Sequence, residues 1–390
     1  MRGSIRIVRL LGIPVFANVS LLLTLAIVTG LLALSLYPAV IPDASPYKDN
    51  QLVHWLMALV SAIAFFSSIL VHELAHSVVA RRQGLDVERI TLFIFGGVSQ
   101  IAGEPRRPLN EFVMAIVGPL ASLALGGVLF GLWVLGGSSD SDPFWIVIQW
   151  LLFMNLVVGI FNLVPAFPMD GGRIFRSGLW GLSGDFLSAT RWASFLGRAF
   201  GYGMMFVGGL AIFGRIGFLG SWESGIWLAI LGIYLESAAR QSWLQARALA
   251  TLSSYRAADL MSAELKTAVG SDSWRNLLGR ADGRFIFFVA DADDAVVGVL
   301  TEKETAAAGL DPGVGTTVAD LMVRTADAKV AAPDDDAAKL LQKMEEGSVW
   351  HLPVVSEGRV VGVVSKDNLL RLLSRNLLPR RALPADARGR

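Results

Sequence analysis

Long apolar runs dominate the first 245 residues of this chain and restrict what it can fold into. An α-helix needs about 20 apolar residues to cross the hydrocarbon core of a bilayer. Six runs meet this requirement, over residues 16–39, 52–80, 109–136, 144–165, 196–214 and 224–243. Hydrophobic residues make up 53% of the chain and charged residues only 17%, which is too apolar for an ordinary soluble protein. We therefore predict a mainly α-helical, polytopic membrane protein with a six-helix transmembrane core.

Two of the four histidines lie four positions apart inside the second apolar run, at His72 and His76, with Glu73 between them. This is the H-E-x-x-H pattern of zinc hydrolases. Residues four apart lie on one face of a helix, so both imidazoles can reach a single ion. Glu73 can then take a proton from a water that the metal activates. The pattern is short, and two histidines packed inside a helix bundle are the alternative interpretation.

A third ligand is expected, because a catalytic zinc has three protein ligands and one open position. The chain has no cysteine, so the ligands must be imidazoles and carboxylates. Asp170 is the candidate, since it follows the fourth run just after that run is broken by Pro165 and Pro168. An ionisable residue in a membrane is costly unless it is paired or metal-bound. The sequence therefore predicts one zinc per chain, held by His72, His76 and Asp170.

Basic residues orient the six runs. They precede the first and third runs, follow the second and fourth and close the sixth, with one dissenting arginine between the fifth and sixth. The positive-inside rule then places both termini in the cytoplasm. Arg81 follows His76 by five residues, and Asp170 precedes both Arg173 and Arg176 closely. The zinc site is therefore expected just inside the cytoplasmic face.

Two segments outside the runs have strand character. Residues 4–13 partly alternate, which suits a short strand at the membrane surface. Residues 90–101 lie between the second and third runs and carry glycines at a bend, which predicts a β-hairpin or a bent strand. An exposed strand can pair with an unwound substrate, so four residues here are assigned to substrate binding. They are Gly96, Gly97, Val98 and Ser99.

Asn162 is a candidate for binding the developing oxyanion or the substrate backbone, with an interhelical hydrogen bond as its alternative role. Residues 162–171 read N-x-x-P-x-x-P-M-D-G. Together with H-E-x-x-H, this segment resembles the site-2 protease family of intramembrane zinc metalloproteases, in its prokaryotic branch with C-terminal CBS domains. The resemblance covers nearly the whole chain and implies the same three zinc ligands and a catalytic Glu73. Met169 stands where the family more often has leucine.

From about residue 253 the chain is charged, and short strands and helices recur in a weak internal repeat. Both copies contain the sequences A-D-L-M and V-G-V. They resemble a tandem pair of CBS domains, which in many proteins binds adenine nucleotides through the pattern G-x-x-S/T-x-x-D. Here that pattern ends with Thr301 and Glu304 in one copy and with Ser365 and Asn368 in the other. The resemblance implies ATP, ADP or AMP as a ligand, and the changed last position leaves a structural or dimerising role open.

These features predict a transmembrane metalloprotease domain over residues 1–247, CBS domains over 253–312 and 313–376, and a flexible tail over 377–390. A short membrane-associated β-sheet accompanies the helical core, and the α/β CBS module is cytosolic. The predicted function is regulated intramembrane proteolysis in the cell (inner) membrane, near its cytoplasmic face. The resemblance to the family implies single-pass membrane proteins as substrates, and we expect no nucleic acid and a homodimer through the CBS domains. A CBS-gated transporter or channel and a zinc-binding pseudoprotease are the alternatives.

Overall fold

The computed structural model describes residues 3–94, 96–136, 142–214, 222–273, 277, 286–290, 296–301, 316–325 and 327–377. The chain divides into two compact units, Met1–Trp243 and Leu244–Arg390. Each unit has hydrophobic clusters of its own, so each is described by itself.

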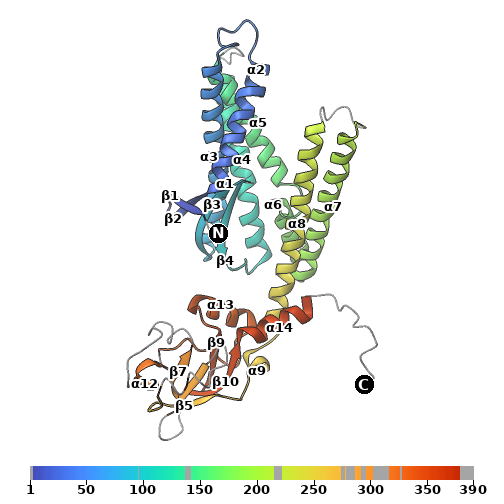
Figure 1. The fold of residues 1–390 in the computed structure, drawn as a ribbon. Coiled ribbons are helices and arrows are strands. Elements are labelled where there is room, and N and C mark those ends of the chain that lie inside the picture. Colours follow the sequence, from blue (N-terminus) through green and yellow to red (C-terminus); the bar gives the residue numbers. More distant parts are fainter. Residues whose placement is uncertain are drawn as a thin grey trace. The chain divides into compact units, whose positions relative to one another are not determined.

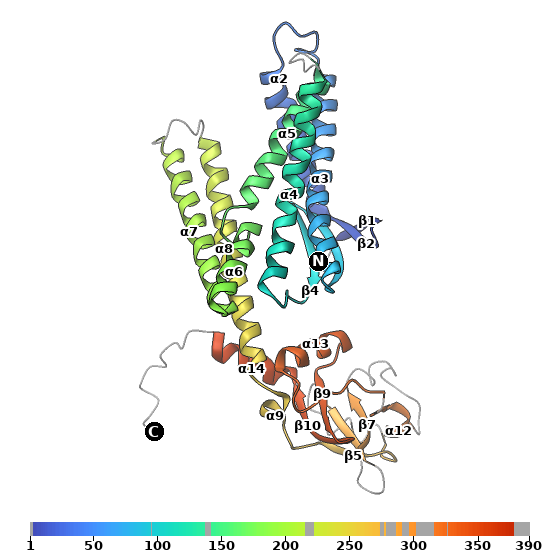
Figure 2. The same cartoon turned by 180° about the vertical axis from the view of Figure 1, so that it is seen from behind.

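The first unit is built mainly from helices (Figures 1 and 2). In chain order they are α1 (Val19–Leu31), the π-helical turn η1 (Leu32–Leu36), α2 (Tyr37–Val40), α3 (Gln51–Arg82), α4 (Pro108–Leu135), α5 (Pro143–Asn162), α6 (Asp170–Ser183), α7 (Phe186–Ile212) and the part of α8 (Trp222–Ser253) that precedes Leu244. Asn18, Asn50 and Asp142 cap α1, α3 and α5, and each side chain accepts a hydrogen bond from a backbone N–H of the first turn. Short polar residues therefore mark where these apolar helices begin.

Five segments among the described residues are helical, long and apolar enough to cross a membrane. They are Val19–Val40, Gln51–Arg82, Pro108–Leu135, Pro143–Asn162 and Phe186–Ile212. The fifth begins well before its predicted start at residue 196, because Asp185 caps the helix through the amides of Leu187 and Ser188. The sixth predicted run forms part of α8, which is not among these five, so the predicted count of six spans is not confirmed.

A four-stranded sheet packs against α3. Its strands are β1 (Ser4–Leu10), β2 (Ile13–Asn18), β3 (Asp86–Phe93) and β4 (Gly96–Ala102), in that order. β1–β2 and β3–β4 are antiparallel hairpins, whereas β2 and β3 run parallel. Both segments with predicted strand character therefore form strands, and β4 lies at an edge of the sheet. The position of this sheet relative to a membrane stays a prediction.

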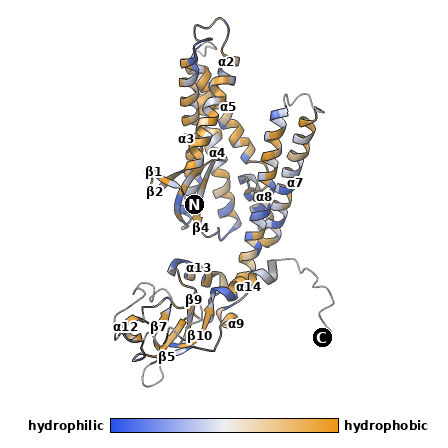
Figure 3. Ribbon diagram, in the orientation of Figure 1, coloured by the Kyte–Doolittle hydropathy of each residue, from blue (hydrophilic) through white to orange (hydrophobic). Residues whose placement is uncertain are grey.

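The helices of the first unit expose large apolar side chains. Leu22 on α1, Phe153 on α5 and Phe206 on α7 are 62%, 61% and 68% exposed. Figure 3 shows hydrophobic residues along much of these helices. Such a surface is unfavourable in water but suits contact with lipid chains, because a helix satisfies its own backbone hydrogen bonds. The first unit is that of a multi-pass membrane protein.

The second unit combines short helices with two small sheets. The helices are α9 (Ala257–Leu260), α12 (Val318–Leu321), α13 (Ala337–Gly347) and α14 (Lys366–Leu377). One sheet has the order β5 (Thr267–Val269), β6 (Ile286–Ala290), β7 (Val296–Thr301) and β8 (Val323–Arg324), and the other pairs β9 (His351–Ser356) with β10 (Arg359–Ser365).

The internal repeat is visible as matching contacts. The A-D-L-M copies form α9 and α12, and the aspartate of each accepts a hydrogen bond from the backbone N–H that precedes its helix. After α9, Met261 packs against Gly362 of β10, and after α12, Met322 packs against Gly298 of β7. Any side chain at either glycine would overlap the methionine sulfur. Each copy therefore packs on the other, and the two halves form one intertwined unit.

Candidate metal centre

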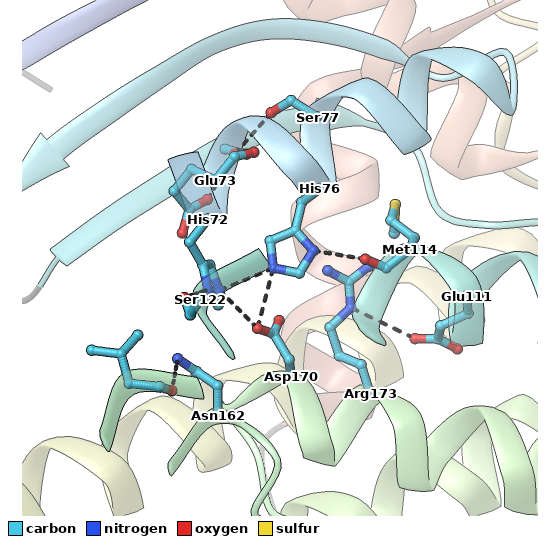
Figure 4. Close-up of polar contacts among 12 residues, drawn as sticks. His72, Glu73, His76, Ser77, Glu111, Met114, Ser122, Asn162, Asp170 and Arg173 are labelled. Carbon is cyan, nitrogen blue, oxygen red and sulfur yellow. Dashed lines mark hydrogen bonds and ion pairs between the residues drawn. The ribbon is translucent and has the colours of Figure 1, made fainter. Parts of the chain in front are cut away.

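Three side chains proposed above as metal ligands converge in the first unit (Figure 4). The Nε2 atoms of His72 and His76 each lie 3.1 Å from Oδ2 of Asp170 and 3.2 Å from one another. Ligand atoms about 2.0 Å from a tetrahedrally coordinated zinc ion lie about 3.3 Å apart. The three atoms therefore have the spacing that zinc requires, and both imidazoles are 5% exposed.

Helix α4 fixes the orientation of both imidazole rings. Nδ1 of His76 lies 2.6 Å from the carbonyl oxygen of Met114, and Nδ1 of His72 lies 2.9 Å from Oγ of Ser122. A carbonyl only accepts, so Nδ1 of His76 carries a proton and Nε2 of the neutral ring offers a lone pair. That lone pair faces the Asp170 carboxylate. A cation suits this arrangement, and the outer hydrogen bonds are those that a zinc-binding histidine usually makes.

A tight loop between α5 and α6 delivers Asp170. The loop begins after Asn162, and Asp170 is the first residue of α6. A side chain at Gly171 would overlap the backbone of Leu163 and Val164, and one at Gly172 would lie 2.5 Å from the backbone N of Phe167. Only glycine lets α6 start against this loop, so the Asp-Gly-Gly sequence sets where the carboxylate lies.

Gly118 provides a second close approach, on α4. A Cβ atom there would overlap Nε2 of His76 and come within 2.7 Å of Nε2 of His72. The backbone of α4 therefore runs beside the ligand atoms themselves. A larger residue at this position would occupy the space of the ion or of its ligands.

The side chain of Glu73 is oriented by a residue of the sheet, whereas both imidazoles are oriented by α4. Its Oε2 accepts a 2.7 Å hydrogen bond from the hydroxyl of Ser99 on β4, and that hydroxyl accepts one from Ser77 on α3. A Cβ at Gly97 would lie 2.5 Å from Cγ of Glu73. Of the four residues assigned to substrate binding, Gly97 and Ser99 thus contact the proposed base.

A cavity of about 550 Å³ opens beside the centre. His72, Glu73 and Asp170 line it at one end. Most of its wall is apolar, with residues of α1, α3, α5 and α8 that include Phe65, Phe66, Ile69, Phe161 and Leu231. Gly96, Gly97 and Val98 also line the cavity, so β4 forms part of its wall.

Asn162 lines the same cavity at the end of α5. Its side-chain Nδ2 donates a 3.0 Å hydrogen bond to the carbonyl oxygen of Val158, one turn earlier on that helix. This bond uses one of the two N–H groups of the amide. The residue is near the candidate centre, and its predicted role in catalysis stays a prediction.

A buried ion pair joins α4 to α6. Glu111 of α4 is fully buried, and its Oε1 accepts two hydrogen bonds from Arg176 of α6. Arg176 is 7% exposed and stacks over the rings of Phe167 and Phe186. Arg176 is one of the basic residues that follow the fourth apolar run, and its side chain is a buried partner of Glu111. The pair holds together the helices that carry Met114 and Asp170.

The sequence reasoning missed the residues that support the ligands. Gly118 and Ser122 belong to a G-P-x-x-S segment inside an apolar run, and nothing local distinguishes them from ordinary helix-packing residues. Glu111 gave a stronger signal, because a carboxylate inside a predicted span needs a partner. Met114 contributes only a backbone carbonyl, which no side-chain pattern can reveal.

The second unit contains two small clefts at the predicted nucleotide positions. One of about 180 Å³ is lined by Ser365 and Asn368, and one of about 200 Å³ is lined by Thr301. The side chain of Asn368 donates a 3.3 Å hydrogen bond to the carbonyl of Leu260. Glu304 lies outside the described residues, so its position relative to Thr301 stays a prediction.

The fold and the site are those of a multi-pass membrane protein with a candidate metal centre. A protein of Mycobacterium tuberculosis named "Putative zinc metalloprotease Rip3" is 33% identical to this chain over 384 residues, covering 96% of this chain and 93% of its own. A protein of Synechocystis named "Putative zinc metalloprotease sll0528" is 29% identical over 96% of both chains. The chain belongs to Peptidase family M50, the site-2 proteases.

Two family models match different parts of the sequence. The model of Peptidase family M50 matches residues 60–139 and 136–204, and the CBS domain model matches residues 318–375. A solved structure titled "Site-2 Protease from Methanocaldococcus jannaschii" has 29% identity and a TM-score of 0.42, and the match covers 62% of this chain and 95% of that one. The two family models and the similarity to Rip3 confirm the predicted family and a CBS domain over residues 318–375, whereas the first predicted CBS domain, over residues 253–312, stays a prediction.

Replacing Gly118 by alanine tests the geometry of the centre. We expect Gly118→Ala to weaken zinc binding by about 10- to 100-fold or more, because the new Cβ overlaps the ligand nitrogens. Zinc content of the purified protein and competition with a chelator measure the effect. Gly127→Ala on the same helix is the matched control, since a Cβ there meets nothing within 4 Å. Equal zinc affinity of both variants would contradict the described site.

Proposed function

We propose that this protein is a zinc-dependent endopeptidase that cuts transmembrane segments of other membrane proteins near the cytoplasmic face, as in regulated intramembrane proteolysis. The observation that carries the proposal is the convergence of His72, His76 and Asp170 at one end of an apolar cavity, with Glu73 beside them. The spacing of the three ligand atoms and the membership of family M50 support it.

The chemistry divides between the ligands and Glu73. A zinc ion held by the three ligands would supply Lewis acidity, which makes water more nucleophilic and a carbonyl more electrophilic. Glu73 accepts a proton as the water oxygen bonds to the scissile carbonyl carbon, and delivers it to the nitrogen as the C–N bond breaks. The products are a carboxylic acid and an amine, and transfer of the acid proton to the amine gives a carboxylate and an ammonium group. Asn162 is proposed to donate its second N–H to the developing oxyanion or to the substrate backbone.

The substrate is proposed to enter as an extended segment. A helical segment has its amides engaged in its own hydrogen bonds, so it must unwind before an amide can be cut. The free edge of β4 offers backbone groups to an unwound chain, and the apolar cavity wall suits the side chains of a transmembrane segment. Gly96 and Val98 contribute to that wall and are the proposed substrate contacts on β4.

The cellular setting is part of the proposal. Basic residues at the predicted cytoplasmic ends favour cytoplasmic termini and a location in the cell (inner) membrane. Single-pass membrane proteins, already trimmed outside, are the proposed substrates, and the CBS pair is proposed to join two copies of the chain. A transporter or channel gated by the CBS pair would also account for the membrane spans. It would not explain why the carboxylate of Glu73 lies beside the proposed metal ligands.

Glu73→Gln tests the proteolytic function. We expect the cleavage rate of a membrane-embedded substrate to fall by about 10²- to 10⁴-fold, because the amide cannot accept the proton. Zinc content should stay at the wild-type level, because Glu73 is not a ligand. The assay uses purified protein in detergent or proteoliposomes.

Three results would contradict this function. If Glu73→Gln cuts as fast as wild type, Glu73 is not the base. If wild-type protein moves zinc across proteoliposomes and cuts nothing, the chain is a transporter. A zinc-loaded wild type that neither cuts nor transports would instead fit a pseudoprotease.

Adenine nucleotide is proposed to regulate the protease through the second unit. The clefts lined by Thr301 and by Ser365 support this, since both present a hydroxyl at the position of the ribose-contact pattern. Binding is expected chiefly in the cleft of Thr301, because Glu304 keeps a carboxylate for ribose hydroxyls whereas Asn368 does not.

Calorimetry on the full-length protein with ATP, ADP and AMP checks the nucleotide proposal. We expect Thr301→Val to weaken binding by about 10-fold, the equivalent of one lost hydrogen bond, and Ser365→Ala to have a smaller effect. Absence of binding of all three nucleotides to wild type would remove the proposal and leave a structural role for this unit.

A further inference from the structure

We propose that Ser99 is a positioning residue for the catalytic base, so that the strand expected to receive the substrate also holds Glu73 in place. This inference rests on the proposed proteolytic function. It assigns Ser99 a different task from the substrate contact that the sequence suggested, and it is carried by the hydrogen bonds around that residue.

The hydroxyl of Ser99 lies in a directed chain of hydrogen bonds. Ser77, fully buried on α3, donates to Oγ of Ser99 over 3.0 Å, and Ser99 donates to Oε2 of Glu73 over 2.7 Å. The backbone carbonyl oxygen of Glu73 also lies 3.3 Å from Oγ of Ser99, but Oε2 is the nearer acceptor at 2.7 Å. An ionised carboxylate only accepts, so the one proton of Ser99 is shared with Glu73 chiefly through Oε2. Ser77 then occupies an acceptor site of Ser99, which fixes the direction of the chain. Bonds in such chains strengthen one another.

Strand alternation explains why Ser99 and not Val98 meets the base. Residues two apart on a strand share a face, so Gly97 and Ser99 both face α3 while Val98 points away from it. Val98 is 38% exposed and lines the cavity, whereas Ser99 is not among the residues that line it. Gly97 packs against Cγ of Glu73, and Ser99 binds its carboxylate oxygen. The glutamate is therefore held at two points by one face of β4.

A substrate strand can pair with the free edge of β4, which is the edge that does not face β3. Among the described strands, β4 pairs only with β3, so its other edge has unpaired backbone groups. A substrate strand bound there would contact the same short strand that holds the base. A glutamate side chain free to rotate spends little time in one position, and a displacement of 1 Å can cost about 100-fold in rate. Pairing at β4 therefore links substrate binding to the position of Glu73.

Steady-state cleavage kinetics of Ser99 variants test this role. We expect Ser99→Ala to lower kcat by about 10-fold or more with KM nearly unchanged, because the base is displaced while the substrate contacts remain. Ser99→Thr keeps the hydroxyl and should restore most of kcat. Ser67→Ala is the matched control, since the exposed Ser67 on α3 bonds only the carbonyl of Ile63 one turn earlier and should behave as wild type.

Infrared spectroscopy detects the hydrogen bond between Ser99 and Glu73 independently of the cleavage rate. The carboxylate stretch of Glu73, obtained as an infrared difference between wild type and Glu73→Gln, should shift in Ser99→Ala and not in Ser67→Ala. An unshifted band, an unchanged kcat, or a Ser99→Thr variant as slow as Ser99→Ala would each overturn the role of Ser99. Wild-type protein that cuts no substrate would instead remove the proteolytic function, while the infrared shift still reports the hydrogen bond.

Discussion

The hydrogen bonds between α4 and the two imidazoles are the constraint on which the rest of this structure depends. Met114 and Ser122 turn both rings so that Nε2 faces Asp170. The same helix carries Glu111, whose buried ion pair with Arg176 holds α6 and therefore Asp170. One helix thus controls all three proposed ligands, although none of the ligands belongs to it. An ion at their centre would offset the cost of placing these polar groups among apolar helices.

The proposed metal ligands and the proposed base, Glu73, are oriented by different layers of the fold. The ligands depend on helix packing, while Glu73 is held by the edge strand of the sheet. The apolar cavity is lined by β4, by the middle of α3 and by the end of α5. A substrate on that strand would therefore reach the base and the ligands together.

The sequence allowed much of this to be predicted because its strongest signals are local. The spacing of His72 and His76 on a helix, and the proline-broken run before Asp170, needed no knowledge of the fold. The supporting residues could not be found, because Gly118 and Ser122 act across a contact between helices far apart in sequence. The burial of Arg176 against Glu111 could not be foreseen for a related reason, because a buried ion pair and a cytoplasmic flank look alike in one dimension. The start of α7 was placed late because Ser188, Thr190 and Arg191 make its first turns more polar than a typical membrane span, although Asp185 caps the helix there.

X-ray absorption at the zinc edge of the purified wild-type protein tests the central claim most directly. The account predicts one zinc per chain with two imidazole nitrogens at about 2.0–2.1 Å, together with oxygen ligands at about 2.0–2.2 Å from a carboxylate and solvent. Asp170→Asn should change the oxygen shell and leave the imidazole signal. Zinc bound without two imidazoles, or a protein that binds no zinc, would contradict the claim.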